Sequence, residues 1–203
     1  MTDPTEHYFT DNPAASEAER RELRTTLAGR DVTVTTAGGV FSPGGADKAT
    51  SILLDVVPEP PAEGDLLDLG CGWGPIALTL AMRSPAATVW AVDVTERALD
   101  LTRRNAAALG LDNVRAVRPE EVPEETPFAA IWSNPPIRVG KAVVHDIMRT
   151  WLPRLAKGAD AHLVVGKNLG ADTLAAWITA ELDLPVVRVA SRKGFRILRV
   201  ERP

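Results

Sequence analysis

Residues Leu66 to Pro75 read LLDLGCGWGP, and this stretch decides the fold of the chain. An apolar strand ends in Asp68, and three alternating glycines (Gly70, Gly72 and Gly74) then lead into a predicted helix. Glycines at this spacing let the backbone turn sharply and approach a ligand that a Cβ atom would exclude, and the helix N-terminus offers unpaired N–H groups. The stretch therefore predicts a site for a nucleotide-like cofactor.

Two further strand ends support this interpretation, which a short glycine repeat would not carry alone. A predicted strand over Val89–Val92 ends in Asp93, at about the 20-residue distance typical of a carboxylate that accepts hydrogen bonds from a ribose. Another, over Phe128–Trp132, continues into Ser133-Asn134-Pro135-Pro136. The spacing of these three polar strand ends along the sequence argues against a chance match.

Length and charge limit the class of protein. With 203 residues, 45% of them apolar, the chain is expected to form one domain, with an amino-terminal lid or hairpin extension over residues 1–45 and a core over 46–203. A net charge of −4 and a pI of about 5.5 argue against a protein whose whole surface clamps nucleic acid, but they allow a local basic patch. The oligomeric state stays open.

Several site classes lack support in the sequence. The single Cys71 excludes an internal disulfide, and no secretory signal or membrane-length apolar run is present, so we expect a cytoplasmic protein without membrane insertion. The three histidines lack metal-ligand spacing, and no Ser-His-Asp or Cys-His arrangement is found. No metal site is predicted.

Strand-like and helix-like patterns alternate along most of the chain. Near the amino terminus, a short helix over Glu17–Arg24 and a small hairpin with its turn at Gly38-Gly39 are predicted. The other predicted helices cover Asp47–Val57, Pro75–Arg83, Glu96–Leu109, Lys141–Leu155 (bent or divided at Pro153) and Asp172–Leu182. The other predicted strands cover Leu66–Leu69, Thr88–Val92, Val114–Val117, Phe128–Trp132, Ala161–Val165, Val186–Ala190 and Phe195–Val200.

This order predicts an α/β fold: a Rossmann-like, seven-stranded, mostly parallel sheet with helices on both faces and a carboxyl-terminal antiparallel hairpin. Ligands in such sheets sit beyond the carboxyl ends of the strands. Asp68, Asp93 and Asn134 all terminate strands at that edge.

On these motifs the chain resembles the class I S-adenosylmethionine-dependent methyltransferases, and more narrowly the small-domain methyltransferase family that includes ribosomal RNA guanine-N2 methyltransferases. The matching residues are Gly39-Val40-Phe41-Ser42-Pro43-Gly44 with Asp47-Lys48, LLDLGCGWGP, Asp93, Ser133-Asn134-Pro135-Pro136 with Gly140-Lys141, and Lys193-Gly194-Phe195-Arg196-Ile197-Leu198.

The resemblance implies an S-adenosyl-L-methionine site in which the three glycines surround the methionine part, Asp68 fixes that arrangement and Asp93 holds the ribose. Asp68 has an alternative role in organising the glycine loop. Glu120 is a substitute for the residue that often receives the adenine amino group. The residues expected to bind the cofactor are Phe41, Ser42, Asp47, Asp68, Gly70, Cys71, Gly72, Gly74, Asp93, Val94, Glu120 and Asn134.

Asn134, Pro135 and Pro136 are the predicted catalytic residues. An aromatic exocyclic amine is a poor nucleophile because its lone pair is delocalised. The carbonyls of Asn134 and Pro135 are expected to accept its two hydrogens and direct the lone pair toward the methyl group. The prolines hold these acceptors in place. Ile137 stands where related amine methyltransferases often have an aromatic residue, which favours the guanine-N2 branch over adenine or glutamine acceptors.

The resemblance thus implies methyl transfer to an exocyclic amine, most simply guanine N2 in ribosomal RNA or a ribosomal subunit, by a catalytic core over residues 46–203. A protein side chain or a small metabolite is the alternative acceptor, and a non-catalytic RNA-binding module is the alternative from another class. The basic residues expected to contact the substrate are Arg138, Lys141, Lys167, Arg192 and Lys193.

Overall fold

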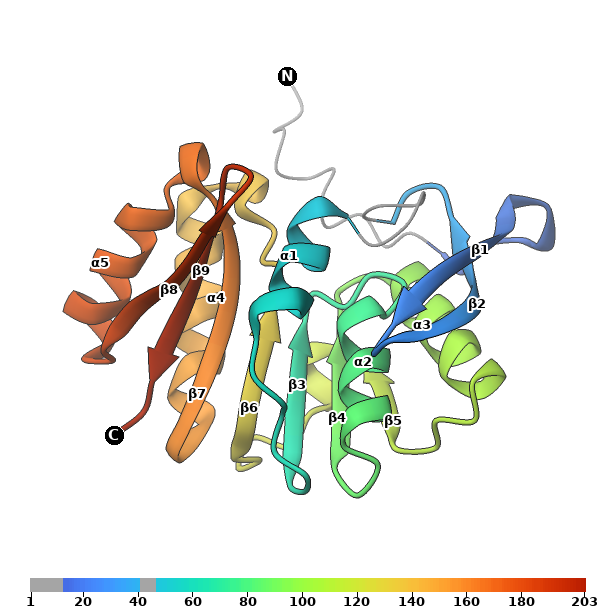
Figure 1. Ribbon diagram of the computed structural model, residues 1–203, viewed down its shortest axis with the longest axis horizontal. Helices are drawn as coiled ribbons and strands as arrows, with labels where there is room; N and C mark the ends of the chain where they lie inside the picture. The colour runs from blue at the N-terminus through green and yellow to red at the C-terminus, as the bar shows by residue number, and fades with distance from the viewer. Residues whose placement is uncertain (1–12, 41–46) are drawn as a thin grey trace.

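A seven-stranded sheet with the strand order β5-β4-β3-β6-β7-β9-β8 forms the centre of the computed structural model, which describes residues 13–40 and 47–203 (Figure 1). The strands are β3 (Asp65–Leu69), β4 (Thr88–Val92), β5 (Val114–Val117), β6 (Phe128–Ser133), β7 (Leu155–Gly166), β8 (Val186–Arg192) and β9 (Phe195–Glu201). The first five run parallel, and β9 is antiparallel to β7 and to β8. The predicted α/β fold class is confirmed.

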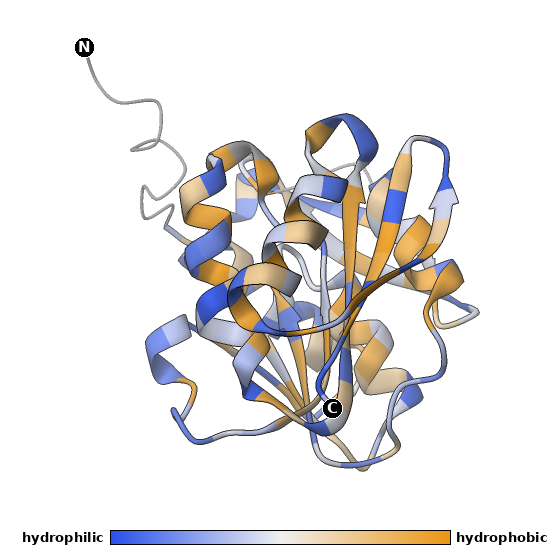
Figure 2. Ribbon diagram, turned by 90° about the vertical axis from the view of Figure 1, so that its left-hand side faces the viewer, coloured by the Kyte–Doolittle hydropathy of each residue, from blue (hydrophilic) through white to orange (hydrophobic). Residues whose placement is uncertain are grey.

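Helices cover both faces of this sheet. Successive side chains of a strand point to opposite faces. Leu66 therefore joins the apolar cluster under α1 and α2, and Leu67 joins the cluster under α4 and α5. Figure 2 shows the resulting apolar band along the central strands. The helices are α1 (Lys48–Val56), α2 (Pro75–Arg83), α3 (Glu96–Ala108), α4 (Lys141–Trp151) and α5 (Ala171–Leu182).

The amino-terminal hairpin differs from the prediction. The expected helix over residues 17–24 is wrong: only η1 (Glu17–Glu19) is a 3-10 turn, and β1 (Arg20–Leu27) begins directly after it. β1 pairs with β2 (Arg30–Ala37) through a turn at Ala28-Gly29, where φ is positive at both residues, and Gly38-Gly39 lies after the hairpin. The reason is tertiary packing, because inward-facing apolar side chains of this hairpin join Trp73 and Leu78 in a third core cluster.

The second difference concerns the region around Pro153. The helix predicted to reach Leu155 ends at Trp151, and a 3-10 turn, η4 (Leu152–Arg154), contains the proline. Proline lacks the backbone N–H that a helix needs, so the chain leaves the helical path here. As a result β7 begins at Leu155, six residues before the predicted Ala161, and its first residue pairs with Phe128. The other predicted elements of the sheet and its helices are confirmed.

Candidate functional site

The predicted site residues meet at one edge of the sheet. In the parallel register, Leu69 at the end of β3 lies opposite Val92 of β4 on one side and Ser133 of β6 on the other. The Ser133 hydroxyl also donates to the Leu69 carbonyl at 2.6 Å, which ties the ends of β3 and β6 together. Asp68, Asp93 and Asn134 therefore lie at the same edge, as the sequence predicts.

The glycine loop after β3 is hydrogen-bonded to the last residue of β4. The carbonyl of Val92 accepts hydrogen bonds from the N–H groups of Gly70 (2.8 Å) and Cys71 (3.0 Å). Gly70 has φ +82°, and a Cβ atom added there would meet no atom within 4 Å. The loop thus leaves an open space above Gly70, next to the strand ends, where a ligand can approach the backbone.

Two other loop residues serve packing. A Cβ atom at Gly74 would approach the Thr102 hydroxyl of α3 to 3.0 Å, so this glycine permits close contact between α2 and α3. The thiol of Cys71 is buried, and the Thr102 hydroxyl lies 3.5 Å from its sulfur. Burial raises the pKa of this thiol well above its usual value. The side chain of Cys71 therefore fills space beneath the loop.

Asp68 is fully buried between the sheet and the first turn of α2. One carboxyl oxygen accepts the Ala77 N–H in the first turn of α2 at 2.9 Å, so Asp68 holds the start of this helix, and its predicted contacts with the glycine loop and the cofactor remain predictions. The other oxygen, Oδ1, is buried without a hydrogen-bond partner among residues 13–40 and 47–203. Burial raises the pKa of Asp68 to about 8, with a further increase from the nearby charge of Asp93. Asp68 thus has an unused polar atom that a ligand with a donor group can satisfy.

Asp93 connects the glycine loop to the turn that follows β4. Its Oδ2 accepts the Gly72 N–H at 3.1 Å, and its Oδ1 accepts the N–H and the hydroxyl of Thr95 at 3.0 and 3.1 Å. Burial raises the pKa of Asp93, although these hydrogen bonds oppose the increase. Each carboxylate oxygen can accept more than one hydrogen bond, so the predicted ribose contact stays compatible with this arrangement.

The side-chain amide of Asn134 is held in one orientation. Its nitrogen donates to the carboxylate of Asp47, at 3.2 and 3.1 Å, and to the hydroxyl of Thr50 at 3.1 Å. Asp47 is itself fixed as the N-cap of α1, because it accepts the Thr50 N–H at 2.6 Å. With the amide nitrogen engaged in this way, the carbonyl oxygen of Asn134 remains as the acceptor for a ligand.

The Ser-Asn-Pro-Pro segment has a second acceptor that is already in use. The Pro135 carbonyl accepts the Ile137 N–H at 2.8 Å and has one further lone pair.

Thr50 was missed in the sequence analysis; its position three residues after the N-cap Asp47 is the only signal that points to it. The predicted roles of Pro135 and Pro136 remain predictions.

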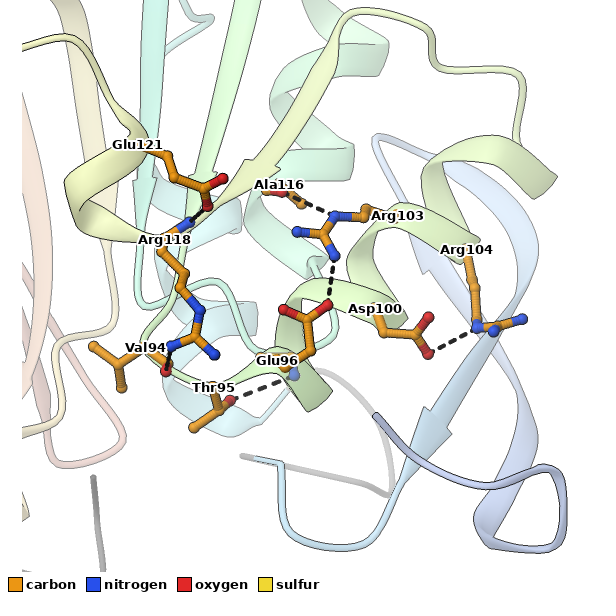
Figure 3. A network of polar contacts seen from close by, with 10 residues as sticks. Val94, Thr95, Glu96, Asp100, Arg103, Arg104, Ala116, Arg118 and Glu121 are labelled. Atoms are coloured by element: carbon orange, nitrogen blue, oxygen red, sulfur yellow. Dashed lines mark hydrogen bonds and ion pairs between the residues drawn. The ribbon is translucent and has the colours of Figure 1, made fainter. Parts of the chain in front are cut away.

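Beyond β4 and β5, a network of polar contacts shapes the adjacent part of the edge (Figure 3). The Arg118 guanidinium donates to the Val94 carbonyl at 3.0 Å, and the Arg118 N–H donates to the Glu121 carboxylate at 2.7 Å. Val94 and Glu120 are both exposed here. Their predicted contacts with the cofactor remain predictions.

Four of the five predicted substrate-contacting cations lie at the same edge of the sheet. Lys141 is exposed at the first residue of α4. Lys167 is brought to the turn between β8 and β9, where its N–H donates to the Gly194 carbonyl at 2.8 Å, and Arg192 and Lys193 are exposed beside it. The side chain of Arg138, and Phe41 and Ser42, lie outside the described residues.

No three His, Cys, Asp or Glu side chains within residues 13–40 and 47–203 are grouped so that they could hold a metal ion. In the same ranges no helix has both the length and the apolar character required to cross a bilayer.

Comparison with known proteins defines the family. The family model for the methyltransferase small domain matches residues 31–199. The chain belongs to this family. It is 34% identical over 201 residues to YbxB of Bacillus subtilis (strain 168), covering 98% of this chain and 99% of the relative. It is 34% identical over 182 residues to ribosomal RNA small subunit methyltransferase C of Pseudomonas aeruginosa (strain LESB58), covering 87% of this chain and 53% of the relative.

A solved structure supports the same assignment. The 16S rRNA N2 G1207 methyltransferase of T. thermophilus, in complex with AdoMet and guanosine, superimposes with a TM-score of 0.80 at 25% identity, covering 95% of this chain and 52% of that chain. The chain thus spans about half the length of these ribosomal RNA methyltransferases and nearly the whole length of YbxB. The small-domain methyltransferase resemblance seen in the sequence is confirmed.

The buried carboxyl of Asp68 gives a prediction for stability against pH. Its pKa is about 8 in the folded protein and ordinary when unfolded, so the folded state binds the extra proton between these values. This contribution to the free energy of unfolding therefore falls as pH rises from about 5 to 8, with a slope of up to about 1.4 kcal/mol per pH unit. Asp93 contributes in the same direction.

Denaturant unfolding of wild type and Asp68→Asn across this pH range isolates the Asp68 part. We expect the variant, which keeps an acceptor for Ala77, to have a flatter profile. Parallel profiles for the two proteins would contradict a raised pKa at Asp68.

Proposed function

We propose that this protein transfers the methyl group of S-adenosyl-L-methionine to the exocyclic N2 amine of guanine in ribosomal RNA, in the cytoplasm. The observation that carries the proposal is the Asn134 amide, whose nitrogen is held by Asp47 and Thr50 at a strand end tied to that of β3. Ribosomal RNA small subunit methyltransferase C is among the relatives more than 30% identical to this chain, and the structure that superimposes with a TM-score of 0.80 is a 16S rRNA N2 G1207 methyltransferase, which supports the choice of acceptor. In this proposal residues 46–203 form the catalytic core of a single domain.

The residues at the strand ends fit the cofactor. The open space above Gly70 admits a ligand against the backbone, and the unpaired Oδ1 of Asp68 suits the methionine ammonium group. Asp93 would hold the ribose hydroxyls, and Val94 and Glu120 would border the adenine. When bound, S-adenosyl-L-methionine supplies an electrophilic methyl group on a sulfonium.

The chain's own contribution to the chemistry is orientation. The side-chain carbonyl of Asn134 accepts one hydrogen of the neutral guanine amine, and the free lone pair of the Pro135 backbone carbonyl accepts the other. With S-adenosyl-L-methionine bound, the nitrogen lone pair would then be directed at its methyl group, and the methyl group would pass from sulfur to nitrogen and leave S-adenosyl-L-homocysteine. No base is needed before this step, because the amine attacks while neutral and loses its proton to water afterwards. Such alignment contributes up to about 7 to 11 kcal/mol to catalysis.

Substrate RNA would lie along the basic part of the edge. Lys167, Arg192 and Lys193 surround the β8–β9 turn, and Lys141 starts the helix that follows the Asn134 segment. Such cations contact phosphates and position an RNA without reading its sequence. The reactive guanine would be presented from a loop or extruded from a helix.

Labelled cofactor incubated separately with ribosomal subunits, naked RNA and protein extract tests the proposed acceptor. We expect the label to enter RNA and to be recovered as N2-methylguanosine on nucleoside analysis. Recovery in protein alone, or in a small metabolite alone, would overturn the proposed acceptor. No measurable cofactor binding by calorimetry at millimolar concentration would favour the non-catalytic RNA-binding module instead.

Asn134→Ala tests the proposed acceptor of the amine hydrogen. Removing it should reduce kcat by about 10²-fold or more, the scale seen when an oriented hydrogen-bonding group is lost from an active site. The cofactor dissociation constant should stay within about threefold. Measured side by side, equal losses in turnover and in cofactor affinity would argue against this role.

Thr50→Val tests the orientation of the Asn134 amide. The loss of the hydroxyl removes one of its two anchors, so the amide can present its nitrogen to the amine, and we expect kcat to fall about tenfold with cofactor affinity unchanged. Thr79→Val is the matched control, since this buried hydroxyl donates to Pro75 within α2. Equal reductions of kcat in both variants would contradict a role of Thr50 in orienting the amide.

The basic edge predicts a salt effect. In the double variant with Lys167→Ala and Lys193→Ala, the slope of log affinity against log salt should decrease in magnitude by about 1.4 to 1.8, since each phosphate contact contributes about 0.7 to 0.9. Lys157→Ala is the control, because Lys157 is exposed near the start of β7, at the opposite edge of the sheet. Filter binding to ribosomal RNA at several salt concentrations measures the slopes, and an unchanged slope for the double variant would exclude this surface.

A further inference from the structure

Two buried polar side chains of α3 hold the carbonyls of the glycine loop. The Thr102 hydroxyl donates to the Gly72 carbonyl at 3.1 Å, and the Asn105 amide donates to the Trp73 carbonyl at 2.9 Å. Thr102 is 0% exposed and Asn105 is 1% exposed. Because these residues are three apart on one helix, they lie on the same face and contact successive peptide groups of the loop.

Asn105 also holds the amino-terminal hairpin. Its amide oxygen accepts the Thr35 N–H at 2.6 Å, and its amide nitrogen donates to the Thr35 carbonyl at 2.9 Å. One side chain thereby pairs with β2 as a neighbouring strand would. With the contact to Trp73, both hydrogens of the amide nitrogen are used, one on the hairpin and one on the glycine loop.

These contacts add to the other constraints on the loop, in which the N–H groups of Gly70 and Cys71 are held by Val92, that of Gly72 by Asp93, and that of Gly74 by the Cys71 carbonyl at 2.9 Å. Gly70, Gly72 and Gly74 all have positive φ, where glycine has little intrinsic preference for one conformation. A peptide group is planar, so fixing a carbonyl also fixes the direction of the next N–H. Anchoring the carbonyls of Gly72 and Trp73 to α3 therefore sets the N–H directions of Trp73 and Gly74.

We propose that Thr102 and Asn105 are positioning residues for the cofactor loop, and that Asn105 couples the docking of the β1–β2 hairpin to the shape of that loop. The inference rests on the proposed function, since it assumes that the loop binds the methyl donor. It assigns the hairpin a role in cofactor affinity through α3, beyond covering apolar surface. The β4 side of the loop, held by Val92 and Asp93, is the fixed side, and α3 is the side that the hairpin influences.

Asn105→Ala tests the coupling, with Asn113→Ala as a matched control. The Asn113 amide also donates to two loop carbonyls, those of Ser84 (3.1 Å) and Ala87 (3.0 Å), but it does so in the turn between α2 and β4. We expect both variants to lower Tm. Only Asn105→Ala should weaken binding of S-adenosyl-L-homocysteine, by about five- to tenfold in calorimetry, and raise the KM for the cofactor at little-changed kcat.

The outcomes separate a positioning role from a merely structural one. Unchanged affinity in folded Asn105→Ala, or an equal loss in Asn113→Ala, overturns the inference while leaving the proposed function in place. If Asn105→Ala does not fold, Thr102→Val carries the test, because valine fills the same space without the hydroxyl; unchanged cofactor affinity in this variant again overturns it. Wild-type protein that binds neither cofactor nor its demethylated product would remove both the inference and the proposed function.

Discussion

The two hydrogen bonds accepted by the Val92 carbonyl, from the N–H groups of Gly70 and Cys71, are the contacts on which the site depends. They join the loop after β3 to the end of β4 and place Asp93 one residue beyond the joint. From there its carboxylate reaches the Gly72 N–H. Because the register of β3 with β6 is also fixed, the Asn134 segment meets the same edge. The Val92 carbonyl thus joins two of the sequence motifs, and the pairing of β3 with β6 adds the third.

The electrostatics of this edge favour a cationic ligand. Asp68 is fully buried and Asp93 is partly buried beside it, and the charge of Asp93 raises the pKa of Asp68 further. Two carboxyl groups in this state cannot both ionise without repulsion. A ligand with an ammonium group and a sulfonium relieves that repulsion, whereas an anionic ligand would increase it. A cationic ligand, such as the methyl donor of the proposed function, would therefore favour the ionised forms of both carboxyl groups.

The elements that the sequence predicted well are those whose signal is local. The glycine loop, the strands that end in Asp68 and Asp93, and the Asn134 segment each have their pattern within about ten residues. β1 was missed because its charged residues suggest a helix, whereas its conformation depends on packing against α2 and α3. Thr50 and Asn105 were missed for the same reason: their partners lie 84 and 70 residues away in the chain. Long-range partners leave no periodic trace in one sequence.

The hydrogen-bonding state of the Asn134 segment also limits the kind of nucleophile that it can serve. The amide nitrogen is engaged by Asp47 and Thr50, and the Pro135 carbonyl already accepts one hydrogen bond from Ile137. Two acceptors, the side-chain carbonyl of Asn134 and the backbone carbonyl of Pro135, remain for a substrate, and these two groups offer it no hydrogen-bond donor. A nucleophile with two hydrogens, such as an exocyclic amine, can satisfy both acceptors, whereas a ring nitrogen without hydrogen would leave them unsatisfied and be repelled by their dipoles. In the proposed function the segment would therefore discriminate by the number of donors on the attacking atom, and Asp47 and Thr50, at the start of α1, would set this discrimination.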